Sequence, residues 1–66
     1  MKKKIMIDGM SCMNCVKHVR EALEELGKVE VNLEGKYALV ETEESDEQLI
    51  EAIDEAGYDV VSIEIL

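Results

Sequence analysis

The only two cysteines of this chain, Cys12 and Cys15, stand three positions apart in the stretch GMSCMNC at residues 9–15. The thiolate is the nucleophilic and the metal-binding form of cysteine. At this spacing, just before a predicted helix, both sulfurs can lie on one side of a turn and reach a single ion. The pair is therefore a candidate metal site, a candidate redox dithiol or a pair of inert core cysteines.

Metal chemistry is the interpretation that the rest of the sequence favours. Soft thiolates select soft ions, Cu(I) foremost and then Zn(II) and similar metals. Two thiolates satisfy Cu(I), whereas Zn(II) normally takes four ligands, and the sequence offers no obvious third and fourth. A zinc ribbon needs a second CxxC pair, and a thioredoxin-like oxidoreductase needs a longer chain with a proline near the motif, but this chain has no proline.

The start of the predicted helix should favour negative charge on the sulfurs. Unsatisfied backbone N–H groups lie there, and Lys17 and His18 follow Cys15 within one turn. We therefore expect the pKa values of the thiols to be lowered, most of all that of Cys15. His18 lies off the apolar stripe and is expected to be a surface residue rather than a third ligand, and Met13 is expected to project into solvent.

Length and charge exclude several classes of function. The chain has 66 residues, which predicts a single domain over residues 1–66. Its net charge is −9, with 16 acidic and 7 basic residues, so we expect no nucleic-acid partner. No stretch approaches the roughly 20 apolar residues that span a membrane, and no long apolar run follows the lysines at 2–4 as in a signal peptide. We expect no membrane insertion and a cytoplasmic location, where thiols stay reduced.

Apolar periodicity predicts an α+β domain. The pattern gives, in chain order, a strand at 5–7, a helix at 14–26, strands at 29–33 and 38–42, a helix at 49–56 and a strand at 61–65. A tight turn at 34–36 joins the two middle strands. This order is the ferredoxin-like βαββαβ arrangement, a four-stranded antiparallel sheet with two helices on one face.

Finer features of the helices and the last strand can also be predicted. Ser45 and Gln48 have the form of a capping box before the second helix, and Gly27 and Gly57 are expected to end the two helices. The stripe of the second helix is predicted to contain Leu49, Ile50, Ile53 and Ala56. The last strand is predicted to alternate through Val61, Ile63 and Ile65.

The predicted topology places distant segments together. In a βαββαβ chain the loop after the first strand, the hairpin at Gly35 and the turn at Gly57 lie at the same end of the domain. Tyr58 should therefore approach the loop that carries Cys12 and Cys15, where it could tune the site.

The stretch at 9–15 resembles the GMxCxxC loop of the heavy-metal-associated domain family. The resemblance extends over nearly the whole chain, through residues 31–34 (VNLE) and 57–60 (GYDV). That family includes small cytosolic copper chaperones and the N-terminal metal-binding modules of metal-transporting P-type ATPases. The resemblance implies that Cys12 and Cys15 are the two Cu(I) ligands, that Met10 is a buried support of the loop, and that Tyr58 neighbours the site as in bacterial chaperones.

Some positions refine the resemblance. Ser11, before the first cysteine, suits the copper members of the family. Asn14 stands where many bacterial copper chaperones have histidine, and the segment between Leu26 and Val31 is shorter than usual in the family.

The expected function is carriage of a metal ion, not catalysis. One Cu(I) would be held between the thiolates and passed by ligand exchange to a partner, which the resemblance implies is a metal-transporting P-type ATPase or its metal-binding domain. We expect a monomer without metal, and a dimer bridged by the metal is compatible with an exposed site. Three alternatives stay open: the same fold binding Zn(II), Cd(II) or Hg(II), a dithiol–disulfide redox protein, and a docking domain with incidental cysteines.

Overall fold

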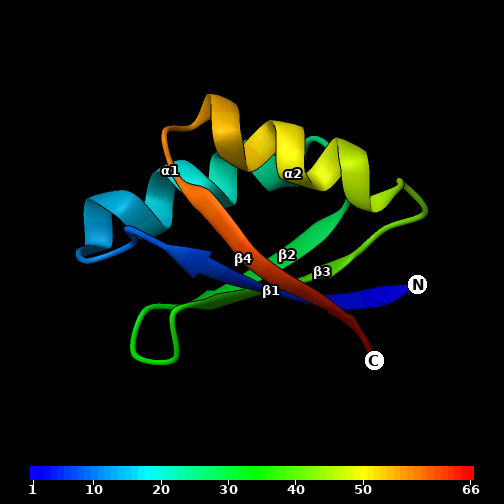
Figure 1. Cartoon of the computed structure of the whole chain (residues 1–66), viewed down its shortest axis with the longest axis horizontal. Helices are drawn as coiled ribbons and strands as arrows, with labels where there is room; N and C mark the ends of the chain where they lie inside the picture. The colour runs from blue at the N-terminus through cyan, green and yellow to red at the C-terminus, as the bar shows by residue number, and fades with distance from the viewer.

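Four strands and two helices form two layers in the computed structural model, which describes all 66 residues. The elements are β1 (Lys2–Asp8), α1 (Met13–Glu24), β2 (Lys28–Asn32), β3 (Tyr37–Glu41), α2 (Asp46–Glu55) and β4 (Asp59–Ile65). The strands pair antiparallel in the order β2-β3-β1-β4, and both helices cover one face of the sheet (Figure 1). The predicted ferredoxin-like fold is confirmed. Neither helix has the length and apolar character needed to cross a membrane.

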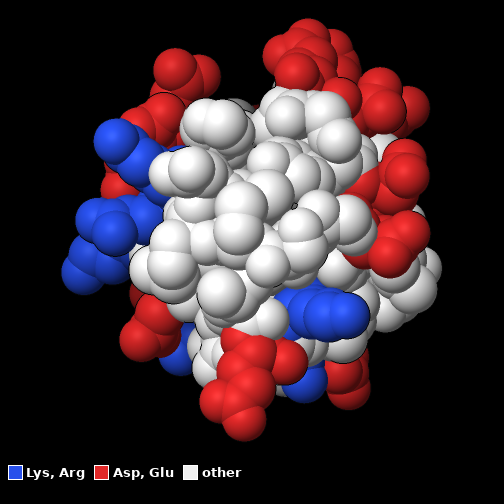
Figure 2. Space-filling model, turned by 90° about the vertical axis from the view of Figure 1, so that its left-hand side faces the viewer, with Lys and Arg blue, Asp and Glu red and all other residues white.

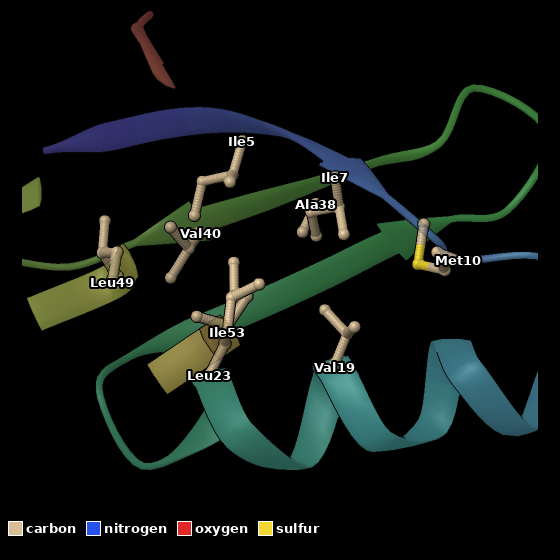
Figure 3. Close-up of a cluster of buried hydrophobic side chains, with 9 residues drawn as sticks. All are labelled: Ile5, Ile7, Met10, Val19, Leu23, Ala38, Val40, Leu49 and Ile53. Atoms are coloured by element: carbon tan, nitrogen blue, oxygen red, sulfur yellow. The ribbon is translucent and has the colours of Figure 1, made fainter. Parts of the chain in front are cut away.

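The hydrophobic core lies between the sheet and the helices. Alternate residues of β1 and β3 face inward, as their period of two predicted, and α1 and α2 each add one buried stripe. Each fully buried aliphatic side chain contributes about 1.5–3 kcal/mol. The core contains Ile5, Ile7, Met10, Val19, Leu23, Ala38, Val40, Leu49 and Ile53, none more than 2% exposed (Figure 3).

The inward stripe of β4 differs from the prediction. Met6 pairs with Ser62 but Ile7 pairs with Val60, so Val61 is an extra residue in a β-bulge. Val60 therefore packs against the core together with Ile63, whereas Val61 is 68% exposed. The expected alternation of Val61 with Ile63 is wrong, because a bulge shifts every residue on one side of it to the other face.

Ile65, the last residue of the predicted stripe, is 59% exposed. It pairs with Lys3 near the free end of an edge strand. Periodicity assigns a residue to a face, but it does not tell whether another element covers that residue.

The second helix begins as predicted but buries a narrower stripe. Its N-cap is Ser45, whose hydroxyl accepts a hydrogen bond from the backbone N–H of Gln48 at 3.4 Å. Leu49 and Ile53 are fully buried, whereas Ile50 is 45% exposed, so its predicted place in the stripe is wrong. Adjacent residues of an α-helix point about 100° apart around its axis, so Ile50 cannot point in the same direction as Leu49.

Gly27 does not end the first helix. The helix ends at Glu24 with Glu25 as C-cap, and Gly27 lies where the chain passes close to β3. A Cβ atom there would collide with the backbone carbonyl of Glu41. The connection is fastened at the same place by Thr42, whose hydroxyl donates a hydrogen bond to the carbonyl of Leu26 at 2.6 Å. Gly27 is therefore required by close packing of backbone, not by helix termination.

Substitution of adjacent residues in α2 tests the assignment of its buried face. Leu49→Ala is expected to lower the free energy of unfolding by about 2–5 kcal/mol, because it leaves a cavity in the core. Ile50→Ala is the matched control and should cost less than about 1 kcal/mol, since much of that side chain is already solvated. Urea denaturation followed by circular dichroism measures both. Equal losses would contradict the register of α2.

Candidate metal site

The loop between β1 and α1, residues 9–12, begins with a backbone conformation that favours glycine. Gly9 has φ +91°, in the region that residues with a Cβ rarely adopt. A Cβ atom at this position would lie 3.5 Å from a ring carbon of Tyr58. Gly9 therefore turns the chain directly beside the Tyr58 ring, so that two parts of the chain far apart in sequence meet at the loop.

Met10 fixes the loop to the core. Its side chain is 1% exposed and belongs to the same cluster as Ile7 and Val19 (Figure 3). A thioether in this position fills core volume and is shielded from an ion at the loop surface. The burial inferred from the resemblance is thus present, and it gives the exposed residues that follow a firm attachment.

The two cysteines lie at the start of α1. Cys12 is the N-cap residue, is exposed and makes no capping hydrogen bond with its side chain, and Cys15 lies in the first turn and is partly buried. Both thiols are free, and their sulfurs are 3.2 Å apart. No acidic residue lies in this turn. The site therefore combines two sulfurs with the helix end that favours negative charge.

Tyr58 reaches the loop because of the way α2 ends. Gly57 has φ +95°, its N–H donates to the carbonyl of Asp54 at 3.0 Å, and the N–H of Tyr58 donates to that of Ile53 at 3.1 Å. These two bonds form a Schellman motif, with Gly57 as the left-handed residue. The predicted role of Gly57 as the end of the helix is confirmed, and the motif turns Tyr58 toward the cysteine loop, as the topology predicted.

Hydrogen bonds to its thiolate lower the pKa of Cys15 to about 6. The largest cause is the Tyr58 hydroxyl, followed by the backbone N–H of Ser11 and the thiol of Cys12. The same contact raises the pKa of Tyr58, because loss of its proton would remove the bond and place two negative charges together. At pH 7 Cys15 is mostly a thiolate. The lowered pKa was predicted, but hydrogen bonds cause it rather than Lys17 and His18.

No further ligand joins the two sulfurs. No set of three or more Cys, His, Asp or Glu side chains is grouped closely enough to hold a metal ion. His18 is exposed and lines a groove between the helices. Met13 is 69% exposed, as expected, and Asn14 also faces solvent. The two thiols are thus without a third cysteine, histidine or acidic side chain that could hold an ion together with them.

Sequence reasoning missed one property of the surface around the site. Despite the overall charge of −9, the end of the molecule that carries the loop is uncharged at its centre, with acidic and basic side chains at its rim (Figure 2). The sequence does contain an uncharged segment, since residues 9–16 have no charged side chain. Only the fold shows that this segment forms part of a larger uncharged surface.

Comparisons with known proteins place the chain among metal-binding domains. The sequence profile of the heavy-metal-associated domain matches residues 4–59. The copper chaperone CopZ of Staphylococcus epidermidis is 43% identical over 65 residues, which cover 89% of this chain and 96% of the relative. The chain spans only 28% of CopZ from Archaeoglobus fulgidus, 42% identical over 83% of this chain. It spans 12% of a mercuric reductase of Lysinibacillus sphaericus, 42% identical over 96% of this chain.

Solved structures agree with the sequence comparison. A CopZ metallochaperone is 31% identical with a TM-score of 0.86, over 92% of this chain and 100% of that structure. The copper-binding domain of HMA7, a P-type ATPase, is 27% identical with a TM-score of 0.84, over 98% and 100% of the two chains. Free-standing proteins and parts of larger proteins therefore share this fold.

Removal of the Tyr58 hydroxyl tests the cause of the lowered thiol pKa. In Tyr58→Phe the pKa of Cys15 should rise from about 6, because the thiolate loses its strongest hydrogen-bond donor. The rate of iodoacetamide alkylation at Cys15, followed by mass spectrometry across pH, gives the midpoint. Tyr37→Phe removes the other tyrosine hydroxyl and should leave the midpoint unchanged. An unshifted midpoint in Tyr58→Phe would show that the hydroxyl is not responsible.

Proposed function

The chain belongs to the heavy-metal-associated domain family, and from this premise we propose that it is a carrier that binds one Cu(I) between the thiolates of Cys12 and Cys15. The observation that carries the proposal is the arrangement of two free sulfurs 3.2 Å apart at the start of α1, one on an exposed and one on a partly buried cysteine, with no third ligand beside them. The copper chaperones among its relatives support the choice of ion.

The ligand set favours Cu(I) over Zn(II). Two soft thiolates can complete the coordination of Cu(I), whereas Zn(II) in proteins normally takes four ligands. Zinc bound here would have to complete its shell with water or with a second protein. The stabilised thiolate of Cys15 adds to the attraction for a cation at neutral pH.

The two cysteine side chains differ in exposure, and this difference suits the uptake and release of a metal ion. Two metal–sulfur bonds of about 2.3 Å each, taking zinc–thiolate bonds as a guide, place the sulfurs up to about 4.6 Å apart in a linear arrangement. The sulfurs lie 3.2 Å apart without metal, so one of them moves outward. Cys12 is exposed and its side chain makes no capping hydrogen bond, whereas Cys15 is partly buried and its thiolate is stabilised by the Tyr58 hydroxyl. Cys12 is therefore the mobile ligand.

Transfer proceeds by exchange of thiolates at the open side of the ion. An incoming thiolate forms a third copper–sulfur bond, the bond to Cys12 breaks, and the released thiolate takes a proton from water. Copper stays Cu(I) throughout, so no oxidant or reductant is needed and the protein performs no catalysis. A second copy of the chain can supply the incoming thiolate in the same way, which gives a dimer bridged by the metal.

The proposed partner is the metal-binding domain of a P-type ATPase. A copper-binding domain of such an ATPase has the same fold, with a TM-score of 0.84, so the two proteins can present equivalent loops to each other. The uncharged centre of the loop face allows this close approach without removing charged groups from water (Figure 2).

Hg(II) is the second candidate ion. A relative named mercuric reductase matches 96% of this chain at 42% identity, and a pair of thiolates suits any soft ion that accepts two ligands. Fold and site do not distinguish the two ions, so the distinction depends on relative affinity.

An anaerobic titration of the reduced protein tests the proposed ligand set. We expect one Cu(I) per chain, held against a competing chelator far more tightly than Zn(II), with Hg(II) titrated in parallel. Cys12→Ser and Cys15→Ser should each abolish tight binding, because a single thiolate cannot complete the site. His18→Ala is the matched control and should bind normally. Tight binding that survives both serine substitutions would contradict the proposal, and preference for Hg(II) alone would favour the second candidate.

A mixing experiment tests transfer. Copper-loaded protein and the metal-free copper-binding domain of a P-type ATPase should exchange the ion until it is shared between them, at a rate that rises with both protein concentrations. Addition of a weak Cu(I) chelator separates direct exchange from release, since direct exchange never frees the ion. If the chelator captures the copper as fast as the domain receives it, transfer does not proceed through a shared intermediate.

A further inference from the structure

A groove between the two helices has a floor of small and apolar side chains. It has a volume of about 500 Å³, and α1 and α2 run antiparallel along its sides (Figure 1). Ala22, Leu26, Ala52 and Ala56 lie along it and are all partly buried. Small residues between neighbouring helices let a further helix approach closely. The groove therefore has a shape into which a third helix could pack.

Acidic side chains line both rims of this groove. Glu21 and Glu25 lie on the α1 side and Glu51 and Glu55 on the α2 side, and no lysine or arginine lines the groove. The ion pairs of the protein are Lys3 with Asp46 and Arg20 with Glu24. All four rim glutamates are thus exposed and without a cationic partner.

Two of the four rim glutamates lie at the C-terminal ends of the helices, where negative charge is destabilising. Neither helix has a basic residue in its last turn, and Glu25 caps α1 at its C-terminal end while Glu55 is the last residue of α2. Carboxylates there are unfavourable, because the C-terminal end of a helix is already negative. Since the helices are antiparallel, one such end lies at each end of the groove, and the stability of the isolated domain does not explain this placement.

We propose that the groove docks a positively charged amphipathic helix of a partner protein. Its small apolar face would lie on the alanines of the floor, and lysines or arginines along its two borders would pair with the four rim glutamates. A nucleic acid is repelled by the same charges, and a lone metal ion lacks a set of three ligands. Charge complementarity with an apolar floor is the recognition mode of a helix in a groove.

This docking goes beyond the carriage of metal and does not need the cysteines. His18 lines the groove and lies one turn of α1 beyond Cys15. A partner helix bound in the groove would be held next to the loop while the uncharged loop face stays free. The groove would thus select the partner, and the thiolates would exchange the ion.

A synthetic helix tests the proposal. The probe is about 18 residues long, enough for several turns, with alanine and leucine on one face and lysine along both borders. Titrated into ¹⁵N-labelled protein, it should shift the amide signals of Ala22, Leu26, Ala52 and Ala56 and bind more weakly as salt rises. A probe with glutamate in place of lysine should not bind. Absence of saturable binding, or shifts spread over the sheet face, would overturn the proposal.

Matched charge removal separates a specific groove from general attraction. The combined variant Glu21→Gln, Glu25→Gln, Glu51→Gln, Glu55→Gln should weaken binding at least about tenfold, from four lost charge pairs. The control Glu30→Gln, Glu34→Gln, Glu43→Gln, Glu64→Gln changes the net charge equally and should weaken it less than about threefold. Equal losses would overturn the proposal. Cys12→Ser with Cys15→Ser should bind the probe normally, so failure of the metal proposal would leave this result unchanged.

Discussion

Burial of Met10 is the interaction on which the loop between β1 and α1, residues 9–12, depends. A site that takes up and releases an ion must face solvent, and exposed loops have few contacts that keep them in place. Met10 provides such contacts by placing one side chain of the loop in the core. Gly9, on one side of it, turns against the Tyr58 ring, and on the other side Cys12 begins α1. Cys12 is therefore exposed at the end of a loop that is anchored to the core, and Cys15 follows it, partly buried, in the first turn of α1.

The N-terminal end of α1 and the C-terminal ends of both helices differ in the charge of their side chains. The N-terminal end of α1 holds two sulfurs and no acidic side chain, whereas acidic residues gather where the helices end. The helix turn that carries Cys15 is thus free of acidic side chains, although the protein has a net charge of −9. Hydrogen bonding to its thiolate, chiefly from the Tyr58 hydroxyl, lowers the pKa of Cys15.

A buried lysine in β1 links the sheet to the start of α2. Lys3 is 6% exposed, and its ammonium lies 2.6 Å from a carboxylate oxygen of Asp46 and 3.2 Å from the carbonyl of Glu44. The strand pattern alone places Lys3 on the inward face with Ile5 and Ile7, but lysine at such a position is normally read as solvent-exposed. Its partners are the first residue of α2 and a residue of the loop before that helix, and only the folded chain brings them near Lys3.

Much of the fold and of the candidate site could be predicted from the spacing of apolar residues, from helix-capping residues and from the order of the elements. The two central strands, the cap at Ser45 and the approach of Tyr58 to the cysteine loop follow from period, cap chemistry and topology. The bulge at Val61 could not be predicted, since it depends on how β4 pairs with β1. The role of Gly27 was missed for a similar reason, because the backbone that it must avoid belongs to a distant strand. Sequence patterns predict which face of a strand or helix a residue lies on. Strand pairing and close backbone contacts cause the departures from that prediction.

X-ray absorption spectroscopy of the protein loaded with one equivalent of Cu(I) can show whether two thiolates alone hold the ion, as we propose. We expect a copper ion with two sulfur neighbours in a near-linear arrangement. We expect no histidine nitrogen and no third sulfur at low protein concentration, where bridged dimers dissociate. A shell of three or four ligands under those conditions, or a spectrum unchanged in Cys12→Ser, would rule out this coordination.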